Sequence, residues 1–563
     1  MASGILSTAV SGLMAFQRSI ETTSHNIANV NTEGFSRQRV ESVANLPEYT
    51  GSGYIGTGVE VTNITRSYDQ FISGQLRSSS SAFGEVDSFK RYAGQIDNLL
   101  ADPSTGMYPA IQSFFNAVNG VANDPSSIAA REVMLIEADS LTHRFGVMSD
   151  RFAEFNDQVN SDVKSMTETV NSYTFAIADL NKRIAADIGR ANGQQQPNDL
   201  LDERDNLLNK LADLVDLSVI PQTNGMVSVL MSNGLPLVMD GLVSTLGVKA
   251  NDFDPTRLEV TYTDIRKQEQ VITDKIKGGK IAGTLRFRAE ILDPAQQKLG
   301  AVASAMVIEF NAMHKTGYDL EGTLGDAFFK FTGVPEVPAI SASSNTGTAT
   351  VTAAFAANSA DLNTSDYLLE LNGGVYTLKR LSDGNSINLT NTAGVLSAVS
   401  PDVLPGITLA VSAGALNGDQ FLIRPTYQTA NNLAMNITDP RKIAAATNLH
   451  TDGVTALPGD NSNALSLASL ANKTGMFGGT ASFQEAYGQI VAKVGGLTHA
   501  ANISASAQQS LLNRATEARE NLAGVNLDEE AANLIKFQQS YQAAAQAIST
   551  ASTLFDTLIG AVR

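Results

Sequence analysis

Residues 24–39 read SHNIANVNTEGFSRQR, and this stretch decides how the N-terminal part of the chain is interpreted. Asparagine, threonine and glycine crowd into residues 26–34, directly after an apolar segment with helical spacing. Asn and Gly favour turns because both accept backbone conformations that other residues avoid. A catalytic loop, a phosphate-binding loop and a structural elbow share this composition, so the surrounding sequence must decide among them.

The two ends of the chain carry apolar residues at seven-residue spacing, which is typical of coiled-coil helices. The N-terminal stripe consists of Leu6, Leu13, Phe16 and Ile20. The C-terminal stripe consists of Leu534, Phe537, Tyr541, Ile548, Phe555 and Leu558. The stripes predict terminal helices that pack on one another as an ordinary coiled coil, or that pack against further copies. Because each stripe is narrow, we expect these helices to gain order when many subunits assemble.

The centre of the chain changes its apolar period twice. Residues 145–188 keep helical spacing throughout, GQQQPN (193–198) interrupts it, and residues 200–217 begin a second helix with Asn198 or Asp199 as its cap. The two helices predict an αα-hairpin. From about residue 219 the period becomes two, with Asn-Gly turns that are typical of β-hairpins, and residues 331–425 also carry strand signals.

The fold class predicted from this layout is an α+β multidomain chain. It has coaxial, coiled-coil-like terminal α-helices, a long α-helical bundle or rod domain, and inserted β-rich outer domains. We expect residues 1–45 with 525–563 to form the terminal domain, and residues 46–218 with 283–325 and 470–524 to form the long helical domain. Residues 219–282 are expected to form a small β subdomain, and residues 326–469 a β-rich outer domain.

Composition excludes several classes of function. A net charge of −18 argues against a nucleic-acid partner, which needs a basic surface. No apolar run approaches the length of a membrane span, so we expect no membrane insertion. The chain has no cysteine, which removes thiolate nucleophiles and Cys-ligated zinc. Residues 1–19 lack a basic n-region and a clean apolar core, so we expect no cleavable secretory signal.

Motifs that suggest chemistry lack their confirming context. GSGYIG (51–56) fits a dinucleotide pattern, but alternating strand residues follow it where a helix is required. The five histidines are isolated, so we expect no metal site and no cofactor. DLLDERD (199–205) could hold the paired carboxylates of a glycosidase. We expect its acids instead to stay solvated at a helix start, where the helix dipole favours them.

The opening stretch resembles a signature of the bacterial flagellar axial family, which comprises rod, hook and hook-associated proteins. The matching residues are Ser24, Asn26, Ile27, Ala28, Asn29, Asn31, Thr32, Gly34 and Phe35. Residues 56–76 resemble a second block of this family, and residues 526–559 resemble its C-terminal helix, with departures at Ala544 and Gln546. Residues 91–102, 197–211 and 308–322 are similar to the hook-associated members at the junction of hook and filament.

The resemblance implies a structural axial subunit that is not an enzyme and lies outside the cell, on the flagellum. It implies export by the flagellar type III apparatus and assembly as a helical ring. The implied partners are further copies of the chain, hook protein, hook-associated protein 3, the filament cap during assembly, and a cytosolic export chaperone that binds the C-terminal helix. Alternatives are a hook or distal-rod subunit, or a secreted wall-degrading or adhesive protein.

Within that frame, the opening stretch is interpreted as an elbow between the inner helices and the outer domains. Asn29 and Asn31 tolerate left-handed backbone and can satisfy the last helix carbonyls, and we expect Gly34 to supply a positive φ. Phe35 can then anchor the exit against the bundle, and Arg37 and Arg39 can face neighbouring acidic subunits. The face formed by Leu534, Tyr541, Ile548 and Phe555 is expected to pack on the face formed by Leu6, Leu13 and Ile20.

Overall fold

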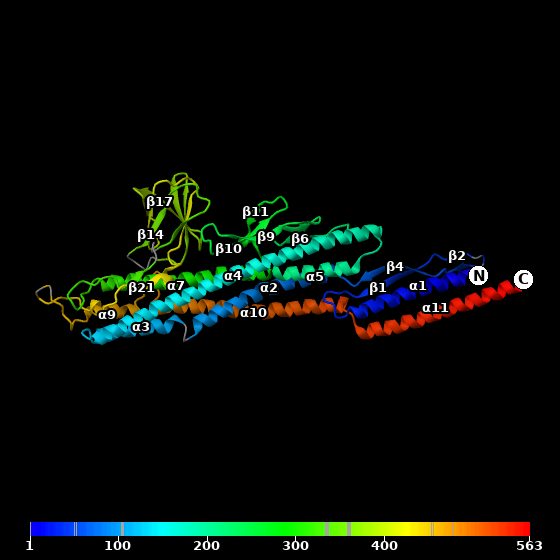
Figure 1. Ribbon diagram of the computed structural model, residues 1–563, viewed down its shortest axis with the longest axis horizontal. Coiled ribbons are helices and arrows are strands. Elements are labelled where there is room, and N and C mark those ends of the chain that lie inside the picture. The colour runs from blue at the N-terminus through cyan, green and yellow to red at the C-terminus, as the bar shows by residue number, and fades with distance from the viewer. Residues whose placement is uncertain are drawn as a thin grey trace.

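The computed structural model describes residues 2–49, 51, 53–102, 106–332, 337–356, 362–451, 453, 455–476 and 478–562, without the side chains of residues 2, 3, 558, 559, 561 and 562. The molecule is long and thin (Figure 1). Helices run along its length, and the β-rich parts project from one side. The α+β multidomain class predicted from the sequence is confirmed.

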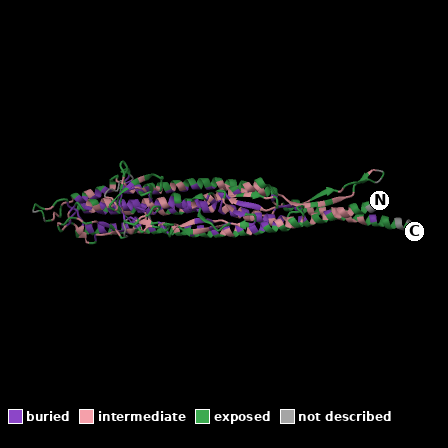
Figure 2. Cartoon of the chain, turned by 90° about the horizontal axis from the view of Figure 1, so that it is seen from above, coloured by how far each residue is buried: buried purple, intermediate pink, exposed green. Residues whose placement is uncertain are grey.

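The two ends of the chain form a pair of helices at one tip of the molecule. Helix α1 (Ala2–Ala28) lies beside α11 (Leu527–Val562), and both termini lie at this tip (Figure 1). Buried residues are concentrated along the rest of the molecule, whereas half-buried and exposed residues dominate this pair (Figure 2). The terminal pair therefore has little core of its own.

The rod consists of antiparallel helices that share one apolar core. Its long members are α2 (Gln70–Ala101), α3 (Met107–Asn123), α4 (Ile128–Arg190), α5 (Asn198–Leu214), α7 (Asp293–His314) and α10 (Phe483–Ala523). The shorter α6 (Gly279–Phe287) runs through a π-turn, η2 (Arg288–Leu292), into α7. Helices α8 (Thr429–Asn432) and α9 (Ser462–Ser469) complete it.

Local sequence explains several helix starts. Asp69 caps α2 by accepting bonds from Phe71 N and Ile72 N, and Ser482 with Glu485 forms a capping box at α10. The predicted cap of α5 was wrong: Pro197 precedes the helix, without a side-chain cap bond. Asn198 instead donates from Nδ2 to the carbonyl of Ile64 at 2.7 Å, so tertiary contact takes the place of the local cap.

A β-ribbon leaves the elbow and runs along the terminal helix pair (Figure 1). Strand β1 (Gln38–Ala44) pairs antiparallel with β4 (Val59–Arg66), the strand predicted from alternation. At its tip, β2 (Glu48–Tyr49) pairs with β3 (Tyr54–Ile55). The glycines of GSGYIG therefore serve turns between short strands, and a strand follows them where a nucleotide-binding loop would need a helix.

The small β subdomain follows α5 and contains two sheets. One has the order β5-β6-β7-β8, and the other has the order β11-β10-β9. Their bounds are β5 (Leu217–Pro221), β6 (Val227–Met231), β7 (Pro236–Met239), β8 (Leu242–Val243), β9 (Thr245–Ala250), β10 (Leu258–Thr263) and β11 (Glu269–Val271). The predicted Asn-Gly hairpin at residues 233–234 joins β6 to β7. A 3-10 turn, η1 (Thr273–Lys275), leads back to the rod.

The outer domain contains an eight-stranded antiparallel sheet of order β13-β20-β15-β16-β17-β18-β19-β14. Its strands are β13 (Ala339–Ser341), β14 (Val351–Phe355), β15 (Tyr367–Asn372), β16 (Val375–Arg380), β17 (Ser386–Thr392), β18 (Val395–Ala398), β19 (Ile407–Val411) and β20 (Gln420–Ile423). The separate core of this sheet lies between Val337 and Ile423.

Residues on either side of that sheet contribute to the rod core instead. Phe328, Phe329 and Ala430 belong to it, as does Leu467 near the end of the expected outer span 326–469. Strands β12 (Phe329–Phe331) and β21 (Leu433–Met435) pair beside the rod, followed by the 3-10 turns η4 (Pro440–Lys442) and η5 (Leu470–Asn472). The expected domain boundaries remain proposals, and the core arrangement favours an outer domain that is shorter at both ends.

Candidate functional site

The elbow begins at Asn26, in the last turn of α1. Its buried side chain donates from Nδ2 to the carbonyl of Gln38 at 2.9 Å and to Glu530 Oε2 at 3.1 Å. Its Oδ1 accepts from Gln38 N at 3.0 Å. One amide therefore joins α1, β1 and the first turn of α11, which is the geometry that lets a chain reverse direction without leaving backbone groups unpaired.

Arg37 forms the second joint of the elbow. Its guanidinium donates from Nε to Glu530 Oε1 at 2.7 Å and from Nη1 to Glu529 Oε2 at 2.8 Å. Its backbone N–H donates to the carbonyl of Ala523, the last residue of α10, at 2.8 Å. Burial lowers the pKa of Arg37, but Glu529 and Glu530 outweigh it and leave that pKa above its ordinary value.

The expectation that Arg37 faces a neighbouring subunit was therefore wrong. Its side chain is buried within its own chain, because two carboxylates on α11 compensate its charge there. Arg39 is exposed, so its contact with a neighbour stays a prediction.

Asp202 on α5 forms the third joint. Its Oδ2 accepts from Ser36 N at 2.7 Å, and its Oδ1 pairs with Arg66 Nη1 at 2.7 Å. Arg66 also pairs with Asp205 at 2.6 Å. Burial is the largest influence on Arg66 and lowers its pKa, but the two carboxylates outweigh it and raise the pKa.

The acids of residues 199–205 were expected to stay solvated, and this was wrong for Asp202 and Asp205. Asp202 is buried and Asp205 is largely covered, because Arg66 comes from β4 to compensate both. The carboxylates fix the elbow to the rod, so they are not free to act as the paired acids of a glycosidase.

The motif residues between these joints shape the turn. Asn29 Nδ2 donates to the carbonyl of His25 at 3.0 Å and so satisfies one of the last helix carbonyls. Thr32 Oγ1 donates to Asn29 Oδ1 at 3.1 Å. Gly34 has φ of +85° and lies against Asn206, where a Cβ atom would collide. The predicted positive φ of Gly34 is confirmed, whereas Asn29 and Asn31 do not adopt left-handed backbone.

Phe35 lies at the exit of the elbow. Its ring meets the edge of the His25 ring at a centroid separation of 5.4 Å, and its carbonyl accepts from Arg519 Nη2 on α10 at 3.0 Å. Ile27 is half-buried, while four other motif residues are exposed in the single chain, namely Ser24, Ala28, Asn31 and Thr32. One side of the motif therefore holds the fold together, and the other side is exposed to solvent in the single chain.

The apolar stripes predicted for the terminal helices are half-buried along most of the pair and become exposed towards the tip. The half-buried members are Leu13, Phe16, Ile20, Leu534, Phe537, Tyr541 and Ile548. Leu6 is 41% exposed and Phe555 is 53% exposed, and the side chain of Leu558 lies outside the described residues. The pairing of α1 with α11 therefore leaves apolar surface open towards the tip.

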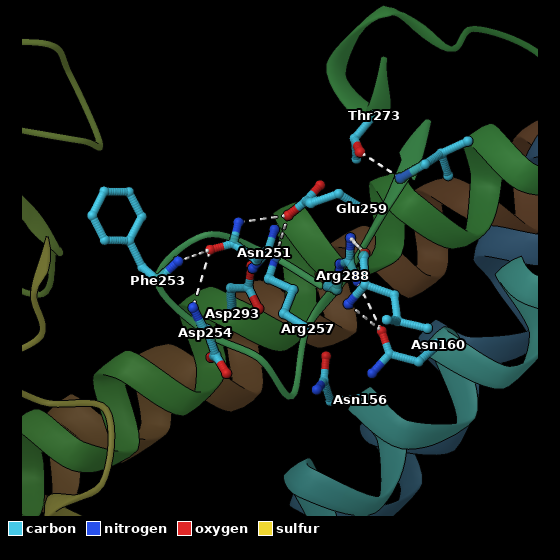
Figure 3. Close-up of polar contacts among 12 residues, drawn as sticks. Asn156, Asn160, Asn251, Phe253, Asp254, Arg257, Glu259, Thr273, Arg288 and Asp293 are labelled. Atoms are coloured by element: carbon cyan, nitrogen blue, oxygen red, sulfur yellow. Dashed lines mark hydrogen bonds and ion pairs between the residues drawn. The ribbon is translucent and has the colours of Figure 1, made fainter. Parts of the chain in front are cut away.

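A second polar junction fixes the small β subdomain to the rod (Figure 3). Arg257 pairs with Asp293 on α7 at 2.7 Å and with Glu259 on β10 at 3.2 Å. Arg288 in the π-turn donates to the carbonyl of Leu258 on β10 at 3.1 Å and to Asn160 Oδ1 on α4 at 3.3 Å. These contacts come from four elements, so the subdomain is fixed in orientation by charge as well as by apolar packing.

The outer domain is attached through Arg424, which is also buried. It pairs with Asp254 of the small subdomain at 2.7 Å and with Asp366 of the outer domain at 3.0 Å. The two β-rich parts are therefore linked by one guanidinium, next to a cleft of about 780 Å³.

The described residues hold no group of three or more His, Asp or Glu side chains that could bind a metal ion. His314 is buried: its Nδ1 lies 2.7 Å from the carbonyl of Asp326, and its Nε2 accepts from Ala444 N at 2.9 Å. Burial lowers its pKa to about 4, so it is neutral at pH 7. Across the described helices, none is long and apolar enough to cross a membrane.

Sequence reasoning found the motif but missed the residues that hold it from outside. Glu530, Arg66 and Asp202 are separated from the motif by long stretches of chain, and no local pattern links them to it. The acidic first turn of α11, residues 528–530, was the one available signal, because charges at a helix start beside an arginine-containing turn can form pairs.

Comparison with sequence families gives four matches along the chain. The flagellar hook-associated protein FlgK helical domain matches residues 93–329, and the flagellar hook-associated protein 1 D2-like domain matches residues 340–425. The flagella basal body rod protein family matches residues 6–35, and the flagellar basal body rod FlgEFG protein C-terminal family matches residues 521–561.

Individual relatives agree over nearly the whole length. The chain is 32% identical to flagellar hook-associated protein 1 of Salmonella typhimurium over 561 residues, 99% of each chain. It is 30% identical to the protein of that name in Escherichia coli K12, again over 99% of each chain. The solved flagellar hook junction protein of Burkholderia pseudomallei has the same fold, with a TM-score of 0.71, 23% identity, and coverage of 80% of this chain and 100% of that chain.

Proposed function

The chain belongs to the flagellar hook-associated protein 1 family, and from that premise we propose how it serves as the junction between hook and filament. It is a structural axial component of the bacterial flagellum. This family is favoured over the alternatives considered from the sequence, which were a hook subunit, a distal-rod subunit, and a secreted wall-degrading or adhesive protein. The two families of flagellar basal body rod proteins match only residues 6–35 and 521–561, at the ends of the chain, so they do not support a rod subunit.

The subunits assemble through the terminal helix pair. One observation carries this proposal: α1 and α11 pair with each other, yet Leu6, Phe555 and other apolar side chains near the tip stay exposed. Exposed apolar surface on a weakly packed helix pair is stabilised when a neighbour covers it. A contact that repeats with rotation and rise builds a helical ring in place of a closed dimer.

The partners are further copies of the chain, hook protein on one side and hook-associated protein 3 on the other, with the filament cap present during assembly. A cytosolic chaperone holds the C-terminal helix before type III export without a cleaved signal, and the assembled subunit lies outside the cell. The chain carries no catalytic activity. Membership of the family and the exposed apolar side chains near the end of α11 support this proposal.

The substitution Phe555→Asp tests the proposal. It places a charge on the exposed part of α11, where the single chain loses little packing because the side chain is already 53% exposed. We expect the purified chain to keep its helix content by circular dichroism. We expect cells with this variant to keep hooks, to lack filaments by electron microscopy, and to release filament subunits into the medium.

Val403→Asp is the matched control, since Val403 is an exposed apolar residue in the outer domain, far from the terminal pair. Cells with the control should make normal filaments. Normal filaments with Phe555→Asp would show that this face of α11 takes no part in assembly.

A further inference from the structure

A cavity of about 380 Å³ lies where the elbow, the rod and the small β subdomain meet. The end of β4, the start of α2, helix α5 and the hairpin of β5 and β6 surround it. Three arginines line it, namely Arg66, Arg77 and Arg204. Three guanidinium groups around one cavity require compensating negative charge, since buried cations of like sign repel each other.

Arg66 is compensated within the chain. Its Nη1 pairs with Asp202 at 2.7 Å and with Asp205 at 2.6 Å, and its guanidinium lies 4.2 Å from the centre of the Tyr68 ring. The carboxylates of Asp202 and Asp205 are therefore both used by one arginine. Three positive charges against two negative charges leave one positive charge over.

Arg204 has only neutral partners. Its Nη1 donates to Asn181 Oδ1 at 3.1 Å and to the carbonyl of Gly225 at 2.7 Å, while its buried Nε has no partner. The side chain lies on α5, and the residue is only 5% exposed. Burial lowers its pKa, and the charges of Arg66 and Arg77 lower it further against the opposing effect of Asp205.

Arg77 on α2 is the most unusual of the three. The residue is 7% exposed, and it makes no hydrogen bond or ion pair with any residue that the structure describes. Its Nη1 is fully covered and unpartnered. A buried charge without a partner is unfavourable, because the folded chain does not replace the water that solvates it in the unfolded state.

We propose that this cavity binds an oxyanion, with Arg77 and Arg204 as its principal ligands. A phosphate or carboxylate group in the cavity lies beside both guanidinium groups and supplies the missing negative charge. A water molecule could satisfy the N–H groups but would leave the charge excess in place. The anion comes either from solution as free phosphate or from a carboxylate side chain of a second copy.

Thermal unfolding of the full chain tests the site. Inorganic phosphate should raise the midpoint of unfolding more than sodium chloride at equal ionic strength, because a ligand that binds only the folded state stabilises it. Arg77→Met should abolish that difference. In sodium chloride without phosphate, Arg77→Met should unfold at the same midpoint as the parent chain or at a higher one, because the substitution removes an uncompensated charge and no hydrogen bond.

Arg151→Met is the matched control, because Arg151 is an exposed arginine on α4 whose loss should leave the phosphate response unchanged. Arg77→Lys keeps the charge and should keep part of the response. If a second copy supplies the carboxylate, the midpoint in chloride should rise with protein concentration, and Arg77→Met should remove that rise.

Two results would overturn the proposal. The first is a midpoint that responds neither to phosphate nor to protein concentration. The second is a clear loss of stability for Arg77→Met in chloride at high dilution, which would mean that the guanidinium already has its partner within the chain.

Discussion

Replacing Glu530 with Gln should loosen the terminal helix pair and leave the rod intact. The carboxylate of Glu530 is buried and accepts from Arg37 Nε at 2.7 Å and from Asn26 Nδ2 at 3.1 Å. Gln is nearly isosteric, so the change removes charge with little change in volume. Arg37 then stays buried with Glu529 as its remaining acid.

The size of the effect follows from burial. Breaking a buried ion pair by neutralising one partner costs about 3–5 kcal/mol. Because Glu529 still pairs with Arg37, we expect the lower end, about 3 kcal/mol, which corresponds to roughly a 100-fold change in an opening equilibrium. The loss falls on the opening of α11 from α1, since Glu530 stands in the first turn of α11.

Native-state hydrogen exchange measures that opening directly. Amides of α1 and α11 should exchange about 100-fold faster in Glu530→Gln, while amides of α4 keep their rates. Glu529→Gln is the control: its side chain is 58% exposed, and an exposed pair contributes at most about 1 kcal/mol. Equal α11 exchange in Glu530→Gln and the parent chain would refute the role of this pair in the elbow.

The other two predictions concern the rod. Gly283→Ala should lower the free energy of unfolding by about 1–3 kcal/mol in urea titrations, because a Cβ there meets the backbone of Glu85 on α2. Gly94→Ala, in open space on α2, should instead gain up to about 1 kcal/mol. Burial of His314 lowers its pKa to about 4. Between pH 6.5 and pH 4, His314 is therefore protonated in the unfolded chain but stays neutral in the folded chain. Stability should therefore fall by up to about 3 kcal/mol as pH falls through that window, and His314→Gln should remove this part of the dependence in urea titrations at both pH values.

The sequence predicted well those helices that bury only one face, because such helices carry a clear apolar period. Helix α4 spans Ile128–Arg190, longer than the predicted 145–188, and its apolar spacing is clear because one face contacts the rod core along most of its length. Strand β1 was missed, since QRVESVA is mostly exposed and shows no alternation of apolar and polar residues. A two-stranded ribbon without a core leaves no hydrophobic period to detect.

The elbow could be located from its turn residues, but not its partners. Gly34 needs positive φ, which local composition predicts. The burial of Asp202 depends on Arg66, which is 136 residues away and approaches only after β4 has folded beside α5. Acids at a helix start are solvated by default, so the sequence favoured the wrong environment for Asp202.

The buried charges of the elbow are better explained by geometry than by stability. An ion pair in the interior stabilises a fold weakly at best, because desolvation opposes it, but it tolerates few alternative geometries.

Helix α4 has 63 residues and is about 95 Å long. A tilt of about 5° at the elbow would therefore move the far end of such a lever by about 8 Å. In the proposed ring, copies that share one axis would all hold their rods at the same angle. The pairs of Arg37 with Glu530 and of Arg66 with Asp202 fix that angle from both sides of the turn.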